Sequence, residues 1–226
     1  MKKNNIKKEK LLLIGGEGYI GLVIKKILNK KGYDVYTYDN LIYSKEQKSK
    51  SKKFLYGDIR DSNNLYKILK NFNKIIILAG LVGDPITKNY PKLSKHVNDH
   101  AIVKLIKMSA NLKIKKLIFI STCSNYGMIS SNQIADENFK LKPLSLYAKS
   151  KVKIEKTLIN LKSTNLNYTI LRFATAFGIS ARMRFDLTIN QFVRDIFYKK
   201  KLTIYDADTW RPYCHVFDFA NIIYEV

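Results

Sequence analysis

The sequence predicts a doubly wound α/β fold, in which a parallel sheet is covered by helices on both faces. Two observations lead to this class. Short apolar runs alternate with amphipathic stretches, which is the pattern of strands joined by crossover helices. Most of these runs, such as LIFIS at 117–121 and KIIIL at 74–78, are continuously apolar, as expected for strands buried on both faces. With 226 residues, 46% of them hydrophobic, the chain can bury one sizeable core.

The elements follow in chain order from these runs and from the turn residues between them. The predicted strands are Lys10–Ile14, Asp34–Tyr38, Lys53–Tyr56, Lys74–Leu78, Lys115–Ser121 and Tyr168–Phe173. The predicted helices between them are Tyr19–Lys31 (closed by Gly32), Ser62–Phe72, Ser94–Leu112 and Ser145–Leu161.

The rhythm changes after Phe173, where an arginine-bearing loop, a helix near Thr188–Tyr198 and short extended pieces follow. A last helix begins only at Tyr224. We therefore expect a main domain over 1–174. Residues 175–226 would start a small, C-terminally incomplete substrate-binding region, whose 202–226 part returns in part to the main core.

The chain is strongly basic, with a net charge of +23. A basic chain often binds nucleic acid, yet only six of the 41 basic residues are arginine, and the lysines are dispersed. Lysine, isoleucine and asparagine all have A/T-rich codons, so a biased genome accounts for the excess. The sequence has no recognition helix, zinc-finger spacing or RNA-binding signature, and we expect no specific nucleic-acid partner.

Cysteine content and the N-terminus bear on the compartment. Cys123 and Cys214 are too few for a disulfide framework, and no CxxC pair is present. The segment MKKNNIKKEKLLLIGG resembles a secretory signal, but its apolar run is only four residues long. No segment approaches membrane-spanning length. We expect a cytoplasmic protein without a membrane partner.

Three glycines spaced three apart, Gly15, Gly18 and Gly21, span the junction of the first predicted strand with the first helix. Such glycines let a pyrophosphate approach the N–H groups that begin a helix, although a tight turn with close packing would use the same residues. Asp39 ends the next strand 18 residues after Gly21. A carboxylate there would accept hydrogen bonds from ribose hydroxyls and repel a 2′-phosphate. The combination favours NAD over NADP; alone, Asp39 would also suit a turn.

Further short motifs follow in a recognisable order: YDN at 38–40, GDIRD at 57–61, LAGLVG at 78–83, STCSNYG at 121–127, SLYAKSK at 145–151 and RPYCHVFD at 211–218. Over nearly its whole length the chain resembles the extended short-chain dehydrogenases/reductases, specifically the NAD-dependent nucleotide-sugar epimerase/dehydratase family with its UDP-glucose 4-epimerase-like members. The resemblance implies that the main domain is a Rossmann-type, NAD-binding domain.

The resemblance also assigns the cofactor site. Asp58 and Ile59 match the family's adenine-contacting pair, residues 79–81 match the loop that passes the phosphates and nicotinamide ribose, and Asn98 matches a position that supports the active site. The predicted NAD-binding residues are Gly15, Gly18, Tyr19, Ile20, Gly21, Asp39, Asn40, Asp58, Ile59, Ala79, Gly80, Leu81 and Asn98.

Tyr147 and Lys151 form YxxxK, a spacing that places both side chains on one face of a helix. A phenol ordinarily titrates near pH 10, and a nearby ammonium favours the phenolate. The pair is thus predicted to be catalytic, with Tyr147 as the base; an exposed aromatic beside a solvated lysine is the alternative. Thr122 matches the family's Ser/Thr that hydrogen-bonds the reacting sugar oxygen, or else it caps the strand end.

Cys123 and Ser124 stand where family dehydratases have Asp-Glu, which argues against 4,6-dehydration because neither side chain replaces that acid–base pair. Cys123 is interpreted either as a small packed residue or as an acid/base for 3,5-epimerisation. The three histidines lack metal spacing, and no metal is expected.

The substrate side is predicted from Thr175, Arg182, Arg184, Asp186 and Arg211. Arg211 matches a family arginine that grips the nucleotide diphosphate, a role that suits a planar fork of donors. Arg182 and Arg184 would contact the diphosphate or the sugar; as an alternative they are solvated loop residues.

The resemblance implies NAD-dependent epimerisation of a nucleotide-diphosphate sugar at C4 through a transient 4-keto intermediate. Two alternatives stay open: an NAD(P)H-dependent 4-ketoreductase of a nucleotide-linked keto sugar, and a non-catalytic nucleotide-binding member of the family. The retained YxxxK favours an enzyme. The expected assembly is a homodimer.

Overall fold

Six parallel strands form the main sheet of the computed structural model, which describes residues 8–43, 51–112, 114–130, 132–161, 166–204 and 207–226. The strands are β1 (Lys10–Ile14), β2 (Asp34–Asp39), β3 (Phe54–Tyr56), β4 (Lys74–Ile77), β5 (Lys116–Thr122) and β6 (Asn167–Phe173). Their order is β3-β2-β1-β4-β5-β6, so the direction of strand addition reverses between β1 and β4. In such sheets, ligands bind beyond the carboxyl ends of the strands at this reversal.

Strand β1 shows why the strands are apolar throughout. Its side chains alternate between the two faces of the sheet, so Leu12 and Ile14 join one hydrophobic cluster and Leu11 and Leu13 join the other. All four are at most 5% exposed. A strand buried on both faces has no position at which a polar residue faces water, which confirms the interpretation of the continuous runs.

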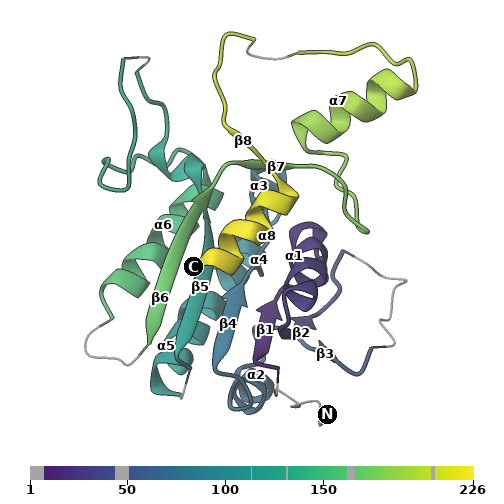
Figure 1. The fold of residues 1–226 in the computed structure, drawn as a ribbon. Helices are drawn as coiled ribbons and strands as arrows, with labels where there is room; N and C mark the ends of the chain where they lie inside the picture. Colours follow the sequence, from purple (N-terminus) through teal and green to yellow (C-terminus); the bar gives the residue numbers. More distant parts are fainter. Residues whose placement is uncertain (1–7, 44–50, 113, 131, 162–165, 205–206) are drawn as a thin grey trace.

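Helices cover both faces of the sheet (Figure 1), which confirms the predicted doubly wound α/β class. Helices α1 (Tyr19–Lys30) and α8 (Val216–Glu225) cover one face, and α2 (Ser62–Leu69), α5 (Ile102–Asn111) and α6 (Leu146–Ile159) cover the other. Among the elements predicted from the sequence between β1 and β6, most ends lie within three residues of the observed ones.

The predicted helix Ser94–Leu112 is wrong in its beginning and in its regularity. The chain is already helical in α3 (Asp84–Asn89) and α4 (Pro91–Ser94), and a π-helical turn, Lys95–Ala101, then leads into α5. Proline lacks a backbone N–H, and Pro91 is tolerated because the N–H of the first helical residue has no acceptor within the helix. Single π-helical turns inside longer helices are frequently found at functional sites.

The C-terminal part differs more from expectation. Strand β7 (Thr175–Phe177) pairs in parallel with β8 (Tyr213–His215), and α7 (Thr188–Phe197) lies between them in sequence. The last helix begins at Val216 rather than at Tyr224, and the His215 ring accepts a hydrogen bond from the Phe217 N–H at its start. Phe219 stacks on Phe173 with ring centroids 3.9 Å apart, so α8 completes the hydrophobic layer over α1.

Candidate active site

A cavity of about 510 Å³ opens beyond the carboxyl ends of β1, β2 and β4 and extends to α6. The predicted site residues that line it are Gly15, Gly18, Tyr19, Ile20, Gly21, Asp39, Asn40, Asp58, Ile59, Ala79, Gly80, Leu81, Tyr147, Lys151, Arg182, Arg184 and Asp186. Thr122, Asn98, Thr175 and Arg211 are not among its lining residues. The fold thus brings the glycine motif and YxxxK, more than 120 residues apart in sequence, to one cavity.

At the three glycines of the predicted motif, Gly15, Gly18 and Gly21, an added side chain would meet different surroundings. Gly15 has φ +82°, and a Cβ there would lie 2.5 Å from the Ala79 nitrogen. A Cβ on Gly21 would lie 2.5 Å from the Gly16 carbonyl oxygen. Gly18 has φ −80°, and a Cβ there would meet nothing nearer than 3.5 Å. The chain's own packing therefore requires Gly15 and Gly21, whereas Gly18 keeps space open on the cavity side.

The start of α1 faces the same cavity without a capping side chain or an acidic residue in its first turn. The first N–H groups of a helix have no intrahelical acceptor, and together with the helix dipole they attract an anion. The Tyr19 hydroxyl is directed elsewhere, because it donates to the Gly178 carbonyl at 2.7 Å. What Tyr19, Ile20 and Gly21 offer a ligand in common is thus the backbone of the first turn.

Asp39 stands at the end of β2, where its two carboxylate oxygens accept from the N–H groups of Glu17 (3.1 Å) and Leu41 (2.8 Å). Burial raises the pKa of Asp39, and these hydrogen bonds oppose that rise. A carboxylate oxygen can accept more than one hydrogen bond, so Asp39 can hold its loop and still receive a hydroxyl donor from the cavity.

Asp58 is held by its own loop. The Arg60 guanidinium donates to both oxygens at 2.9 and 2.7 Å, and Asn40 donates at 2.9 Å. The hydrogen bonds from Arg60 lower the pKa of Asp58 to about 2. Arg60 itself lines the cavity and was not predicted. Its position two residues after Asp58 in GDIRD was the available signal.

Asn98 lies behind the 79–81 loop, in the π-helical turn. It is 4% exposed and makes hydrogen bonds to both the N–H and the carbonyl of Leu81. Gly80, beside this clamp, has φ +154°, and a Cβ there would lie 3.1 Å from Asn98 Oδ1. Asn98 therefore shapes the cavity wall without lining the cavity, and its role in NAD binding stays a prediction.

Tyr147 and Lys151 lie on the first turns of α6, which begins where Ser145 Oγ accepts from the Ala148 N–H at 3.1 Å. Lys151 Nζ donates to the Ile120 carbonyl at 2.7 Å and lies 5.7 Å from the centroid of the Tyr147 ring. Burial lowers the pKa of Lys151 to about 8, an effect that Glu155 opposes. A buried lysine beside a phenol inside a cavity is an arrangement suited to proton transfer.

Thr122, Cys123 and Arg211 lie together at the end of β5. Thr122 Oγ1 accepts from the Ser124 N–H at 3.2 Å, so the hydroxyl does cap the strand end while it keeps a proton to donate. Burial raises the pKa of Cys123, and the nearby Arg211 charge opposes this rise. Arg211 is exposed, and Thr175 takes part in the β7–β8 pair.

The arginines of the 180–186 loop already have partners within the cavity. Arg182 donates to the Tyr43 carbonyl at 2.9 Å, and Arg184 pairs with Asp186 through contacts of 3.1 and 2.5 Å. Burial lowers the pKa of Arg182, and the charge of Asp39 opposes this lowering, so Arg182 lies at the Asp39 end of the cavity. Tyr43, which Arg182 contacts, carries no sequence signal that could have identified it.

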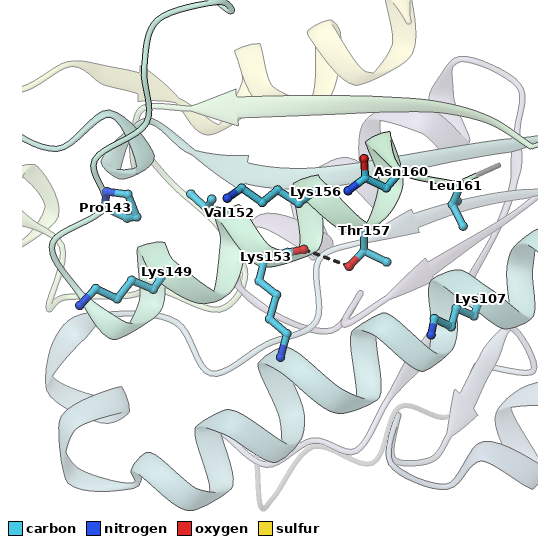
Figure 2. Close-up of a pocket in the computed structure, with 9 residues that line it drawn as sticks. All are labelled: Lys107, Pro143, Lys149, Val152, Lys153, Lys156, Thr157, Asn160 and Leu161. Atoms are coloured by element: carbon cyan, nitrogen blue, oxygen red, sulfur yellow. Dashed lines mark hydrogen bonds between the residues drawn. The ribbon is translucent and has the colours of Figure 1, made fainter.

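A second hollow, of about 680 Å³, lies on the outer side of α6 between that helix and α5. Figure 2 shows lysines from both helices around it. Its lining residues are Lys107, Pro143, Lys149, Val152, Lys153, Lys156, Thr157, Asn160 and Leu161. None of the predicted site residues belongs to it, so α6 separates the YxxxK cavity from a basic outer surface.

Within the described parts of the chain, no helix is long and apolar enough to cross a membrane. The same residues contain no group of three or more His, Cys, Asp or Glu side chains that could hold a metal ion.

Comparisons with known proteins agree with this architecture. The UDP-glucose 4-epimerase of Rhizobium meliloti (strain 1021) is 32% identical over 181 residues, which are 79% of this chain and 53% of that protein. The chain spans about half the length of the first curated relatives it matches.

Solved structures are similar over nearly the whole chain. The UDP-N-acetylglucosamine 4-epimerase of Methanobrevibacter ruminantium M1, in complex with UDP-N-acetylmuramic acid, is 28% identical with a TM-score of 0.83; the match covers 96% of this chain and 72% of that one. The UDP-glucose 4-epimerase of Thermus thermophilus, in complex with NAD, has a TM-score of 0.84 at 24% identity, over 96% and 73% of the two chains, and shows the same fold. Residues 11–226 match the family model described as "NAD dependent epimerase/dehydratase family". The chain therefore belongs to the NAD dependent epimerase/dehydratase family.

Proposed function

We propose that the protein is an NAD-dependent enzyme that epimerises a nucleotide-diphosphate sugar at C4 through a transient 4-keto sugar. One observation carries the proposal: the glycine loop, Asp39 and the Tyr147–Lys151 pair line the same cavity. Relatives named UDP-glucose 4-epimerase support the substrate class. Because the chain spans only part of those relatives, nucleotide and sugar are proposed as a class.

The residues present fit NAD. Gly18 leaves open the space that a Cβ would occupy, and the uncapped start of α1 suits the pyrophosphate. Asp39 would receive the adenosine ribose hydroxyls and disfavour a 2′-phosphate. Asp58, Asn40 and Ile59 would line the adenine side, and the 79–81 loop would pass the phosphates and the nicotinamide ribose.

When bound, NAD supplies a reversible hydride acceptor for C4 of the sugar. The Tyr147 phenolate would accept the proton of the 4-hydroxyl, and the Lys151 ammonium favours that phenolate by its charge. The Thr122 hydroxyl would hydrogen-bond the reacting oxygen. Positioned acid–base groups of this kind typically contribute about 10²–10⁴-fold to the rate.

The substrate side is proposed to lie toward the C-terminal elements. In this proposal residues 1–174 form the NAD-binding domain and residues 175–226 begin the substrate-binding region, with 202–226 partly returning to the core. The packing of α8 on α1 supports that return. Thr175, Arg182, Arg184, Asp186 and Arg211 are the proposed substrate contacts, with Arg211 on the diphosphate.

The test is to incubate the protein with UDP-, GDP-, CDP- and dTDP-sugars, to resolve the products, and to follow the absorbance of reduced cofactor. Product without net change in cofactor supports epimerisation. Stoichiometric oxidation of NADH with a keto substrate would instead identify the ketoreductase, and binding without turnover would identify a non-catalytic protein.

Tyr147→Phe is the matching variant, because it keeps the ring but removes the phenol that accepts the proton. Turnover should fall by about 10²–10⁴-fold while folding is preserved. Tyr56→Phe is the control, since Tyr56 is 69% exposed and lies outside the cavity. Equal activity of Tyr147→Phe and the parent would refute the catalytic assignment.

The compartment and assembly are proposed on separate grounds. Both cysteines are free thiols, which suits a cytoplasmic protein. A homodimer is proposed from the family resemblance. If two copies met through the lysine-lined hollow, added salt would strengthen the dimer, because salt screens the repulsion between the lysines of the two copies. The dispersed lysines support the proposal that the protein has no specific nucleic-acid partner. The proposed reaction does not require a membrane partner.

A further inference from the structure

A buried carboxylate, Glu155, lies one helical turn beyond Lys151 on α6. The two residues are four apart, so their side chains share a face of the helix. Glu155 is 1% exposed and Lys151 is 6% exposed. Glu155 does not line the cavity, so any contribution it makes to the site is exerted through Lys151.

Donors from two strands and a turn fix this carboxylate. Oε1 accepts from Ser121 Oγ at 2.5 Å and from Asn125 Nδ2 at 2.7 Å, and Oε2 accepts from Arg172 Nη2 at 2.8 Å and Nε at 3.1 Å. Arg172 is fixed in turn, since it donates to the Tyr126 hydroxyl and the Glu137 carbonyl. These donors, one of them a guanidinium that can bind a carboxylate with two N–H groups, hold the Glu155 carboxylate in one position.

The orientation of Asn125 is the second observation. Its Nδ2 donates to both Glu155 and Ser121, while its Oδ1 is buried without a hydrogen-bond partner. An unsatisfied buried acceptor is unfavourable, and the reversed amide would bring that oxygen against the carboxylate. The Asn125 amide is therefore oriented with its Nδ2 donating to Glu155, and its Oδ1 is left without a hydrogen-bond partner.

Packing alone does not require this arrangement. A buried ion pair is often no more stable than apolar side chains of the same volume, so the Glu155–Arg172 pair needs another reason. The groups that face Lys151 are Phe119 and Ile120 of β5 and Tyr147 and Glu155 of α6. Asp99, from the π-helical turn, pairs instead with the exposed Lys153. Glu155 is thus the anion that acts on Lys151 within the described part of the chain.

We propose that Glu155, held by Ser121, Asn125 and Arg172, is a positioning residue whose fixed negative charge stabilises the Lys151 ammonium beside Tyr147. The inference rests on the proposed roles of Tyr147 and Lys151. If Glu155 acts in this way, the charge of Lys151 depends on a side chain outside the cavity. The pH at which the Tyr147 phenol ionises then depends on the same side chain.

The test is an ultraviolet titration of tyrosinate in the full chain. Subtracting the titration of Tyr147→Phe in each background isolates the signal of Tyr147 from the other tyrosines. In Glu155→Gln the Tyr147 midpoint should move about one pH unit upward, and turnover at neutral pH should fall about tenfold and recover at alkaline pH. An unchanged midpoint in a folded Glu155→Gln protein would overturn the proposal.

Three further variants exclude a purely structural effect. Asp195→Asn removes an Arg-paired carboxylate on α7 and should leave the Tyr147 midpoint unchanged. Glu155→Asp keeps the negative charge, so its Tyr147 midpoint should lie closer to that of the parent than the midpoint of Glu155→Gln does. If Glu155→Gln does not fold, the double variant Glu155→Gln/Arg172→Met removes both charges and should still show the upward shift; an unmoved midpoint there would equally overturn the proposal.

The titration needs no substrate, so the two proposals fail separately. A protein that shows the shift but no epimerisation would contradict the proposed reaction and leave the role of Glu155 supported. A protein that epimerises with an unmoved Tyr147 midpoint would contradict only the role of Glu155.

Discussion

Asn98 forms a two-point clamp on Leu81: its Oδ1 accepts from the Leu81 N–H at 2.8 Å, and its Nδ2 donates to the Leu81 carbonyl at 2.9 Å. The Asn98 amide thus makes the two backbone hydrogen bonds that a neighbouring strand would make if the loop after β4 lay in the sheet. Because Gly80 and Leu81 line the cavity, the clamp ties this part of the cavity wall to the π-helical turn.

Asn98→Ala should weaken NAD binding by about tenfold or more, because it leaves a buried N–H and carbonyl unpaired at a cost of about 1–3 kcal/mol and frees the loop. Isothermal titration calorimetry measures the affinity. Ser94→Ala is the control, since it removes only the 3.2 Å hydrogen bond to Asn98. Equal affinities of all three proteins would contradict the proposed role of the clamp.

Gly18→Ala and Gly21→Ala should separate binding from folding. A Cβ at position 18 would meet nothing nearer than 3.5 Å, so Gly18→Ala should unfold at the parent's temperature yet lose most NAD affinity. A Cβ at position 21 would lie 2.5 Å from a backbone oxygen, so Gly21→Ala should be less stable by about 1–3 kcal/mol. Thermal unfolding with and without NAD measures both effects. Normal NAD binding by Gly18→Ala would contradict the proposal that NAD occupies the space left open at Gly18.

Asp39→Asn should shift the ratio of NADP to NAD affinity toward NADP by roughly tenfold or more, because a charge that repels a 2′-phosphate is removed beside Arg182. Parallel binding titrations with the two cofactors give the ratio. Asp186→Asn, which removes a carboxylate paired with Arg184 in the same cavity, should leave it unchanged. A parent protein that prefers NADP would show that Asp39 has another role.

Lys151→Met should abolish turnover yet stabilise the fold by about 1–3 kcal/mol at pH 7, because a buried ammonium is replaced by an apolar side chain. In the native state the pKa of Lys151 lies at about 8, below the ordinary 10.5. As pH rises between these values, the unfolded parent binds more protons than the native one, so the parent gains stability and the advantage of Lys151→Met shrinks.

Urea unfolding of both proteins at pH 7 and pH 10 measures this difference. Lys153→Met, on the exposed side of the same helix, should change stability by no more than about 0.5 kcal/mol at either pH. A destabilised Lys151→Met protein at pH 7 would show that the ammonium contributes more to the native state than its burial costs.

Much of the fold could be predicted because its signals are local. The runs around Leu12 and Phe119 are apolar for strands buried on both faces, and the glycines after Ile14 mark a strand–helix junction. The YxxxK spacing places Tyr147 and Lys151 together whatever the rest of the chain does.

Other features depend on contacts distant in sequence. Strand β8 has only three residues, and its pairing with β7 joins segments 38 positions apart, Tyr213 with Thr175. The placement of Arg182 near Asp39 likewise follows from the assembled loop. The sequence prediction starts the last helix at Tyr224 instead of Val216, although Val216, Phe219, Ala220 and Ile223 have helical spacing.

The position of α8 has a consequence for how the molecule forms during synthesis. Helix α1 is made within the first 30 residues, yet the apolar side chains of α8 that share its cluster belong to residues 216–225. Contacts between segments so far apart close large loops, which slows folding and raises contact order. The α1 side of the core therefore stays exposed on the ribosome until α8 has been synthesised, and Val23, Ile24 and Leu28 are apolar side chains that a chaperone would bind in the nascent chain.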